Sequence, residues 1–264
     1  MEAVVLLDRP APGVARLVIN RPAKRNAIDH AVRQALIEAL EALGADGSVR
    51  ALVLGGAEGV FSAGGDLPSM AGLDAEHAAA RMRHIHTLCQ ALVGCGYSIV
   101  SAIEGVAAGA AVGMALLGDH IVIGRGARVL FPFLRLGLAP DWGQLLTLPR
   151  RVGAPTAWRL VTSSDPVTGE EAFRIGLADQ LVEDLEVMSA AVAEAARLAK
   201  LPLDALRRTR ARIASPSASL AEELAREERD QIACLTGAEF DEGYRAFMSK
   251  RAPDFVALAH TDAP

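Results

Sequence analysis

Short apolar runs alternate with segments of helical periodicity along most of the chain. The runs at 51–54, 99–103 and 121–123 have the length and composition of buried strands, and helical patterns separate them. Two earlier runs, 4–7 and 14–19, flank a Pro- and Gly-containing turn and predict a hairpin. This alternation of strands and helices predicts the α/β class for the main domain.

Residues typical of helix ends mark several of the predicted helices. Asp29 is a predicted N-cap, and apolar residues follow at helical spacing until Gly44. The alanine-rich segment 74–92 has a helical pattern. Residues 149–154 are predicted as a turn before a helix at 158–161, and Thr168 with Glu171 forms a predicted capping box for a helix that Gly176 closes.

The last part of the chain is helical throughout. Helices are predicted at 187–200, 203–213, 220–235 and 240–250, with a break at Ser215-Pro216-Ser217. We therefore divide the chain into a core of residues 1–200 and a C-terminal helical region of residues 201–264.

Composition narrows the class of function. The 264 residues include 27 Lys and Arg against 32 Asp and Glu, and the net charge of −5 argues against nucleic acid as a partner. The three cysteines have no metal or disulfide spacing, so neither kind of site is expected. We see no secretory signal and no apolar stretch of spanning length, so no membrane partner and a cytoplasmic location are expected.

Two turns built of small residues are the candidate sites for binding an oxyanion. Gly105, Gly109 and Gly113 recur every four residues after an apolar run, which indicates a strand, a tight turn and the start of a helix. The free N–H groups of a helix start can hold an oxyanion, although small residues can also serve close helix packing alone. A similar turn lies at 61–67, so two turns could converge on one oxygen.

The sequence resembles the crotonase, or enoyl-CoA hydratase/isomerase, superfamily. The resemblance is carried by Arg21-Pro22-Ala23-Lys24-Arg25-Asn26-Ala27, by Phe61-Ser62-Ala63-Gly64-Gly65-Asp66-Leu67, and by the segment EGVAAGAAVG that begins at Glu104. It implies a spiral of ββα units, with C-terminal helices that assemble a homotrimer, often paired into a hexamer. It also implies that the N–H groups of Gly65 and Ala110 hold a thioester oxygen, with Gly109 as the neighbouring alternative to Ala110.

The acid–base residues depart from the family's hydratase pattern. The two hydratase glutamates of the family correspond to Gly113 and Phe133 here, which argues against hydration by paired glutamates. One acid remains nearby, Asp141, whose apolar neighbours should raise its pKa toward that of a useful general base. Its other interpretation is a cap for a helix that begins near Trp142.

The segment around Asp141 is most similar to family members of the 1,2-epoxyphenylacetyl-CoA isomerase type. An acyl-CoA isomerase that acts on an unsaturated or ring-epoxide thioester through an enolate is therefore the leading hypothesis. Aryl-CoA hydrolytic dehalogenation, with Asp141 as nucleophile and His86 activating water, is an alternative. A second alternative is an enoyl-CoA hydratase-like protein that binds acyl-CoA and has weak or lost activity. His86 can equally be an ordinary helix residue without a chemical role.

The resemblance also implies where coenzyme A, as part of the substrate, is bound. We expect contacts from Lys24, Arg25 and Ala63, and from the C-terminal pair Phe247 and Lys250, together with Arg251; the basic residues can also be plain surface charges. No other cofactor and no metal are expected. Possible acyl-pocket residues are Met70, Leu73, Met82 and Met114, whereas Asp66 is expected to bond local backbone and Glu104 to be structural.

Overall fold

A six-stranded sheet forms the centre of the computed structural model, which describes residues 2–258. Its order is β1-β2-β3-β4-β6-β9; β1 and β2 pair antiparallel, and the remaining neighbours pair parallel. The strands are β1 (Val5–Ala11), β2 (Val14–Ile19), β3 (Ala51–Gly56), β4 (Ser98–Ile103), β6 (His120–Gly124) and β9 (Gln180–Val182). The predicted hairpin and three central strands are thus confirmed.

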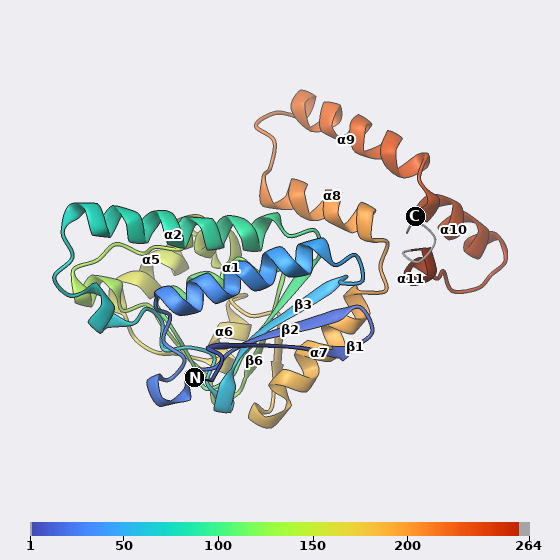
Figure 1. The fold of residues 1–264 in the computed structure, drawn as a ribbon. Helices are drawn as coiled ribbons and strands as arrows, with labels where there is room; N and C mark the ends of the chain where they lie inside the picture. Colours follow the sequence, from blue (N-terminus) through green and yellow to red (C-terminus); the bar gives the residue numbers. More distant parts are fainter. Residues whose placement is uncertain (1, 259–264) are drawn as a thin grey trace.

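Helices cover both faces of this sheet (Figure 1). Helices α1 (His30–Ala45) and α2 (Ala75–Gly94) lie on one face, and α7 (Val187–Leu198) lies on the other. Successive β3 residues divide between two buried clusters: Leu52 joins the first, and Val53 joins the one that contains α7. This period of two explains why the strand is apolar throughout.

A second, three-stranded sheet carries the glycine-rich turn. It consists of β5 (Val106–Ala108), β7 (Arg128–Leu130) and β8 (Val167–Thr168). Helix α3 (Ala110–Leu116) follows β5 after a single residue, Gly109, with φ of 52°. The predicted strand, tight turn and helix start are therefore present.

The predicted turn at 149–154 is wrong. Pro149 lies inside helix α4 (Gln144–Val152), and the break falls at Gly153, where φ is 76° and helix α5 (Ala154–Ser163) begins directly afterwards. Glycine reaches this backbone conformation without a steric cost, so the break falls at Gly153, and Pro149 is accommodated inside α4.

The predicted N-caps are confirmed, although the Glu171 side chain pairs with Arg174 and not with the Thr168 N–H that a full capping box requires. The Asp29 side chain accepts a hydrogen bond of 3.0 Å from the Val32 N–H, and Thr168 accepts one of 3.2 Å from Glu171 at the start of α6 (Gly169–Arg174). Gly44 does not stop α1, which continues to Ala45, because its φ is not in the left-handed region.

The C-terminal helices extend from the sheet on one side (Figure 1). They are α8 (Leu203–Ala214), α9 (Leu220–Leu235), α10 (Ala238–Met248) and α11 (Phe255–Leu258), with the predicted break between α8 and α9. Arg210 fixes α8 to the core through Asp119 at 2.7 Å and through the Cys95 carbonyl at 2.7 Å. The mixed α/β class with a helical C-terminal region is confirmed. Across residues 2–258, every helix is too short or too polar to cross a bilayer.

Candidate active site

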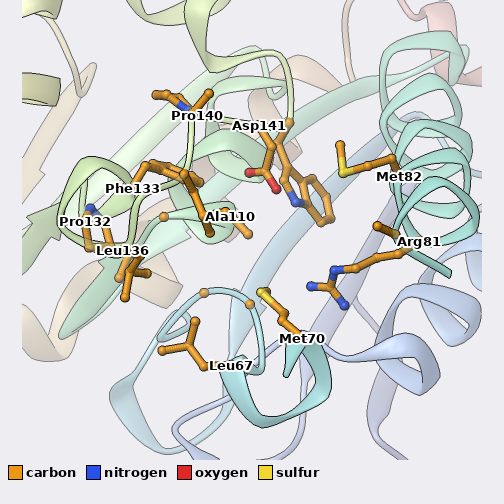
Figure 2. Close-up of a pocket in the computed structure, with 18 of the residues that line it drawn as sticks. Leu67, Met70, Arg81, Met82, Ala110, Pro132, Phe133, Leu136, Pro140 and Asp141 are labelled. Carbon is orange, nitrogen blue, oxygen red and sulfur yellow. The ribbon is translucent and has the colours of Figure 1, made fainter. Parts of the chain in front are cut away.

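Four segments enclose a cavity of about 660 Å³ (Figure 2). They are the turn at Ala63–Gly65, the start of α3 at Ala110, the loop that contains Asp141, and one face of α2. Its wall is mainly apolar, and the remaining lining includes Leu67, Met70, Leu73, Met82, Leu136 and Leu138. The sequence singled out the first three segments, and the fold brings them together.

Backbone hydrogen bonds join the two small-residue turns. Ser62 N–H donates to Val106 at 3.0 Å, and Ala108 N–H donates back to Ser62 at 3.1 Å. A Cβ on Gly64 would stand 2.3 Å from the Ala108 carbonyl oxygen and 3.6 Å from the Ala110 nitrogen. Only glycine permits this approach, so Gly64 is what allows the two turns to touch.

The N–H groups of Gly65 and Ala110 face no acceptor within the described chain. Neither donates a hydrogen bond to any residue in 2–258, whereas the N–H of Gly109 donates to Leu130 at 2.9 Å. Ala110 is also the first residue of α3, where N–H groups have no partner inside the helix. Ala110 is therefore better placed than Gly109 to offer a donor to a ligand.

Asp141 lies in the wall of the same cavity, with its carboxylate directed inward in Figure 2. Its Oδ1 is buried and has no hydrogen-bond partner among residues 2–258. Burial raises the pKa of Asp141 to about 6, against the opposing charges of Arg81 and His86. The helix-cap interpretation is not supported, since α4 begins at Gln144 behind Gly143 and no side chain caps it.

Gln144 connects Asp141 to the oxyanion turn. Its Nε2 donates to the carbonyl oxygens of Gly109 and Asp141, each at 3.1 Å, and its backbone N–H also donates to Asp141. Gln144 is buried, and it was missed from the sequence because nothing local indicates these distant partners.

Trp142 and Arg81 were missed as well. Trp142 lines the cavity but is only 2% exposed, and its φ of 54° is unusual for a bulky residue. Arg81 projects from α2 toward the cavity (Figure 2). The spacing of Ala78, Arg81 and Ile85 along α2 was a usable signal, since it places Arg81 near the buried face.

The positions without glutamate are filled by other groups. Phe133 is buried in the cavity wall, and a Cβ on Gly113 would stand 2.4 Å from the Cβ of Trp142. The Gly113 position is therefore closed to an added carboxylate in this backbone, and the Phe133 position carries an aromatic ring in place of one.

Most of the residues predicted for the acyl pocket line the cavity, and one does not. His86 and Ala63 line the cavity, as do Met70, Leu73 and Met82. Met114 was wrongly placed in the acyl pocket: it is 1% exposed and packs in the core, because α3 turns that face toward the sheet.

The acidic and basic residues around the first turn form a cluster. The prediction that Asp66 bonds local backbone is wrong: its carboxylate accepts from Arg21 at 3.3 Å and from Lys24 at 3.5 Å. The Arg25 carbonyl accepts from Ala63 N–H at 2.9 Å. Burial raises the pKa of Glu104, which lies outside the lining.

The C-terminal residues predicted to contact coenzyme A lie away from this cavity. Phe247 is 81% exposed on α10, and Lys250 follows that helix, at the end of the molecule opposite α2 and α5 in Figure 1. Within residues 2–258, neither contributes to the cavity lining.

Comparison with known proteins adds to this geometry. The family model described as Enoyl-CoA hydratase/isomerase matches residues 10–257. A probable enoyl-CoA hydratase of Rhodobacter capsulatus is 34% identical over 92% of this chain and 95% of that protein. The 1,2-epoxyphenylacetyl-CoA isomerase of Escherichia coli is 31% identical over 95% of this chain and 98% of that protein.

A solved structure of a related protein has the same fold. The putative enoyl-CoA hydratase of Streptomyces coelicolor superposes with a TM-score of 0.90 at 33% identity, over 96% of this chain and 94% of that one. The architecture described above is therefore that of a crotonase fold.

Proposed function

The chain belongs to the enoyl-CoA hydratase/isomerase family, and on that premise we propose that it is an acyl-CoA isomerase with Asp141 as its acid–base residue. One observation carries the proposal: a buried carboxylate oxygen, Asp141 Oδ1, shares a cavity with two backbone N–H groups, and none of the three has a hydrogen-bond partner within residues 2–258. The substrate class we propose is an unsaturated or ring-epoxide CoA thioester.

The chemistry needs one proton-carrying group. Asp141 takes a proton from the carbon chain next to the thioester, and the C–H electron pair moves into a dienolate whose negative charge rests on the thioester oxygen. The N–H groups of Gly65 and Ala110 stabilise that oxygen, an effect worth roughly 10²- to 10³-fold in rate per donor. Protonated Asp141 then returns the proton at another carbon, so the double bond moves and nothing is consumed.

The steric block at Gly113 and the aromatic ring at Phe133 support isomerisation over hydration. Hydration by two glutamates needs a second carboxylate to hold water, and among residues 2–258 the only acid in the lining is Asp141. The printed activity of the Escherichia coli relative, an isomerase at 31% identity, is consistent with this proposal, although other relatives have hydratase names.

Coenzyme A and assembly follow as further parts of the proposal. Lys24 and Arg25 would contact the nucleotide phosphates, Ala63 the region near the thioester, and Phe247 and Lys250 the CoA of a neighbouring subunit. The exposure of Phe240, Tyr244 and Phe247 on α10 supports a homotrimer or homohexamer, in which these rings would be covered. Light scattering on the purified protein tests the assembly.

The decisive experiment compares the wild-type protein with Asp141→Asn on a panel of enoyl-CoA and ring-epoxide CoA thioesters in deuterium oxide. We expect deuterium at the α or γ carbon with the wild type, and a loss of roughly 10²- to 10⁴-fold in the variant. Binding of octanoyl-CoA should persist. Full activity in the variant would falsify the assignment of Asp141.

The same panel separates two alternatives. Since His86 lines the cavity with Asp141, a halobenzoyl-CoA is included, and an aspartyl-linked aryl intermediate found by mass spectrometry would favour dehalogenation. Tight binding of every thioester without turnover would instead favour a protein that binds acyl-CoA and has lost its chemistry.

A further inference from the structure

Arg81 brings a positive charge to the wall of the cavity. It projects from α2, and its guanidinium points toward the space between Met70 and Asp141 in Figure 2. The side chain reaches the oxyanion turn: a Cβ on Gly65 would stand 3.5 Å from Arg81 Nη2. The cation therefore borders the glycine whose N–H is free.

This cation has no ion-pair partner in the described part of the chain. No carboxylate of residues 2–258 lies within 4.0 Å of the guanidinium, and its one side-chain hydrogen bond is a long one of 3.4 Å to Ser69 Oγ. The nearby acids are engaged elsewhere: Asp66 with Arg21 and Lys24, and Asp29 with Arg21 at 3.0 Å. Asp141 attracts Arg81 without lying within ion-pair distance of it, so the half-buried guanidinium is left without a contact partner and can pair with a ligand that brings negative charge.

We propose that Arg81 is a catalytic residue that stabilises the enolate oxygen together with the N–H groups of Gly65 and Ala110. This inference rests on the proposed isomerase function and adds a side chain to an oxyanion site otherwise made of backbone. Arginine suits this role because it stays protonated and its N–H groups reach an oxygen from the side.

The charge balance of the reaction explains the position of Arg81. Before proton transfer the negative charge is on Asp141; afterwards Asp141 is neutral and the charge is on the thioester oxygen. Both places face the same cavity as the guanidinium. Arg81 can therefore stabilise the enolate without being held by a permanent partner, and the preorganised charge needs no rearrangement during the step.

The test uses acetoacetyl-CoA, whose enolate absorbs in the ultraviolet and can be titrated without turnover. The host is Asp141→Asn, so that no carboxylate of the cavity lining titrates; His86 also lines the cavity and is common to every protein compared. We expect the apparent pKa of the bound thioester to rise by about 1 to 3 units on adding Arg81→Met, as for loss of an opposite charge within ~4–6 Å.

Two further variants complete the design. Arg83→Met, on the solvent side of the same helix, serves as the matched control and should leave the titration unchanged. Arg81→Lys keeps the charge and should keep most of the effect; it also serves if the methionine variant does not fold. An unchanged titration in Arg81→Met, or equal shifts in Arg81→Met and Arg83→Met, overturns the inference.

Failure of the isomerase proposal is distinguishable from failure of this one. A wild-type protein that moves no double bond while bound acetoacetyl-CoA still titrates low would reject the isomerase function and retain Arg81 as an enolate-binding group. Normal isomerase activity together with an enolate pKa that does not change in Arg81→Met would retain the isomerase function and reject the role of Arg81.

Discussion

The Cβ of Trp142 stands 2.4 Å from the point that a Cβ on Gly113 would occupy. Trp142 is almost completely buried there, and Gln144 Nε2 would lie 3.0 Å from the same point. Gly113 is thus required by the packing of the loop that carries Asp141. The loop can lie where it does only because position 113 has no side chain, and for the same reason this position has no hydratase carboxylate.

A glutamate introduced at position 113 should therefore not create a hydratase. Gly113→Glu forces Trp142 to move, and overpacking of this kind costs roughly 1–3 kcal/mol of stability. We expect a lower urea midpoint and no gain in hydration of an enoyl-CoA. Gly44→Glu is the matched control: it is an exposed helical position with nothing within 4 Å, and it should leave the midpoint unchanged or raise it. Hydration gained at full stability would contradict this steric argument.

Asp141→Asn should stabilise the protein at neutral pH. Burial raises the pKa of Asp141 from an ordinary 3.8 to about 6, and each pKa unit corresponds to ~1.4 kcal/mol. The folded state holds this proton more tightly than the unfolded chain, so the ionised carboxylate destabilises the fold above pH 6, by about 1–3 kcal/mol. That cost declines as the pH falls from about 6 toward 3.8, and it is absent below.

Denaturant midpoints of both proteins at about pH 8 and about pH 4 measure this effect. The variant should exceed the wild type at the higher pH and match it at the lower one, as the raised pKa requires. Equal midpoints at both values would mean that the Asp141 carboxylate is well solvated.

The pH dependence of isomerisation should report the same group. If Asp141 must be ionised to take the first proton, kcat/KM rises with pH through about 6 and then levels off. Replacing Arg81 removes a positive charge that lowers the pKa of Asp141, so the rise should move to higher pH in Arg81→Met. A pH-independent rate between about pH 5 and 8 would count against proton transfer by Asp141.

The sequence predicted those features that depend on local chemistry. The helix of residues 220–235 and the strand of residues 14–19 were predicted with their observed bounds, because apolar periodicity, a Gly turn and a break around Pro216 all lie nearby. The two small-residue turns were also evident, since their glycines are needed for the backbone itself.

Features that depend on tertiary packing could not be predicted in the same way. Helical spacing places Arg81 near the buried face of α2, but only the fold shows that this face borders the cavity and that Arg83 faces solvent. Met114 is an apolar residue beside the oxyanion turn, yet it faces the core. The contact of Gln144 with Gly109 spans 35 residues of sequence and has no local signal.

Gln144 leads to the last prediction, because it holds Asp141 and the oxyanion turn in register. Gln144→Met keeps the size of the side chain but removes the donor to both carbonyl oxygens, which lie at 3.1 Å. Misplacement of reacting groups by about 1 Å can cost roughly 100-fold, so we expect kcat to fall roughly tenfold to hundredfold while KM changes little.

Steady-state kinetics, with acyl-CoA binding measured separately, tests this expectation. Gln90→Met, an exposed glutamine on α2, is the matched control and should behave as the wild type. Gln144→Glu is informative too: it replaces the donating amide by a carboxylate that repels both carbonyl oxygens, so it should be at least as impaired as the methionine variant. A Gln144→Glu protein with normal kcat would show that the two segments are held together by other contacts.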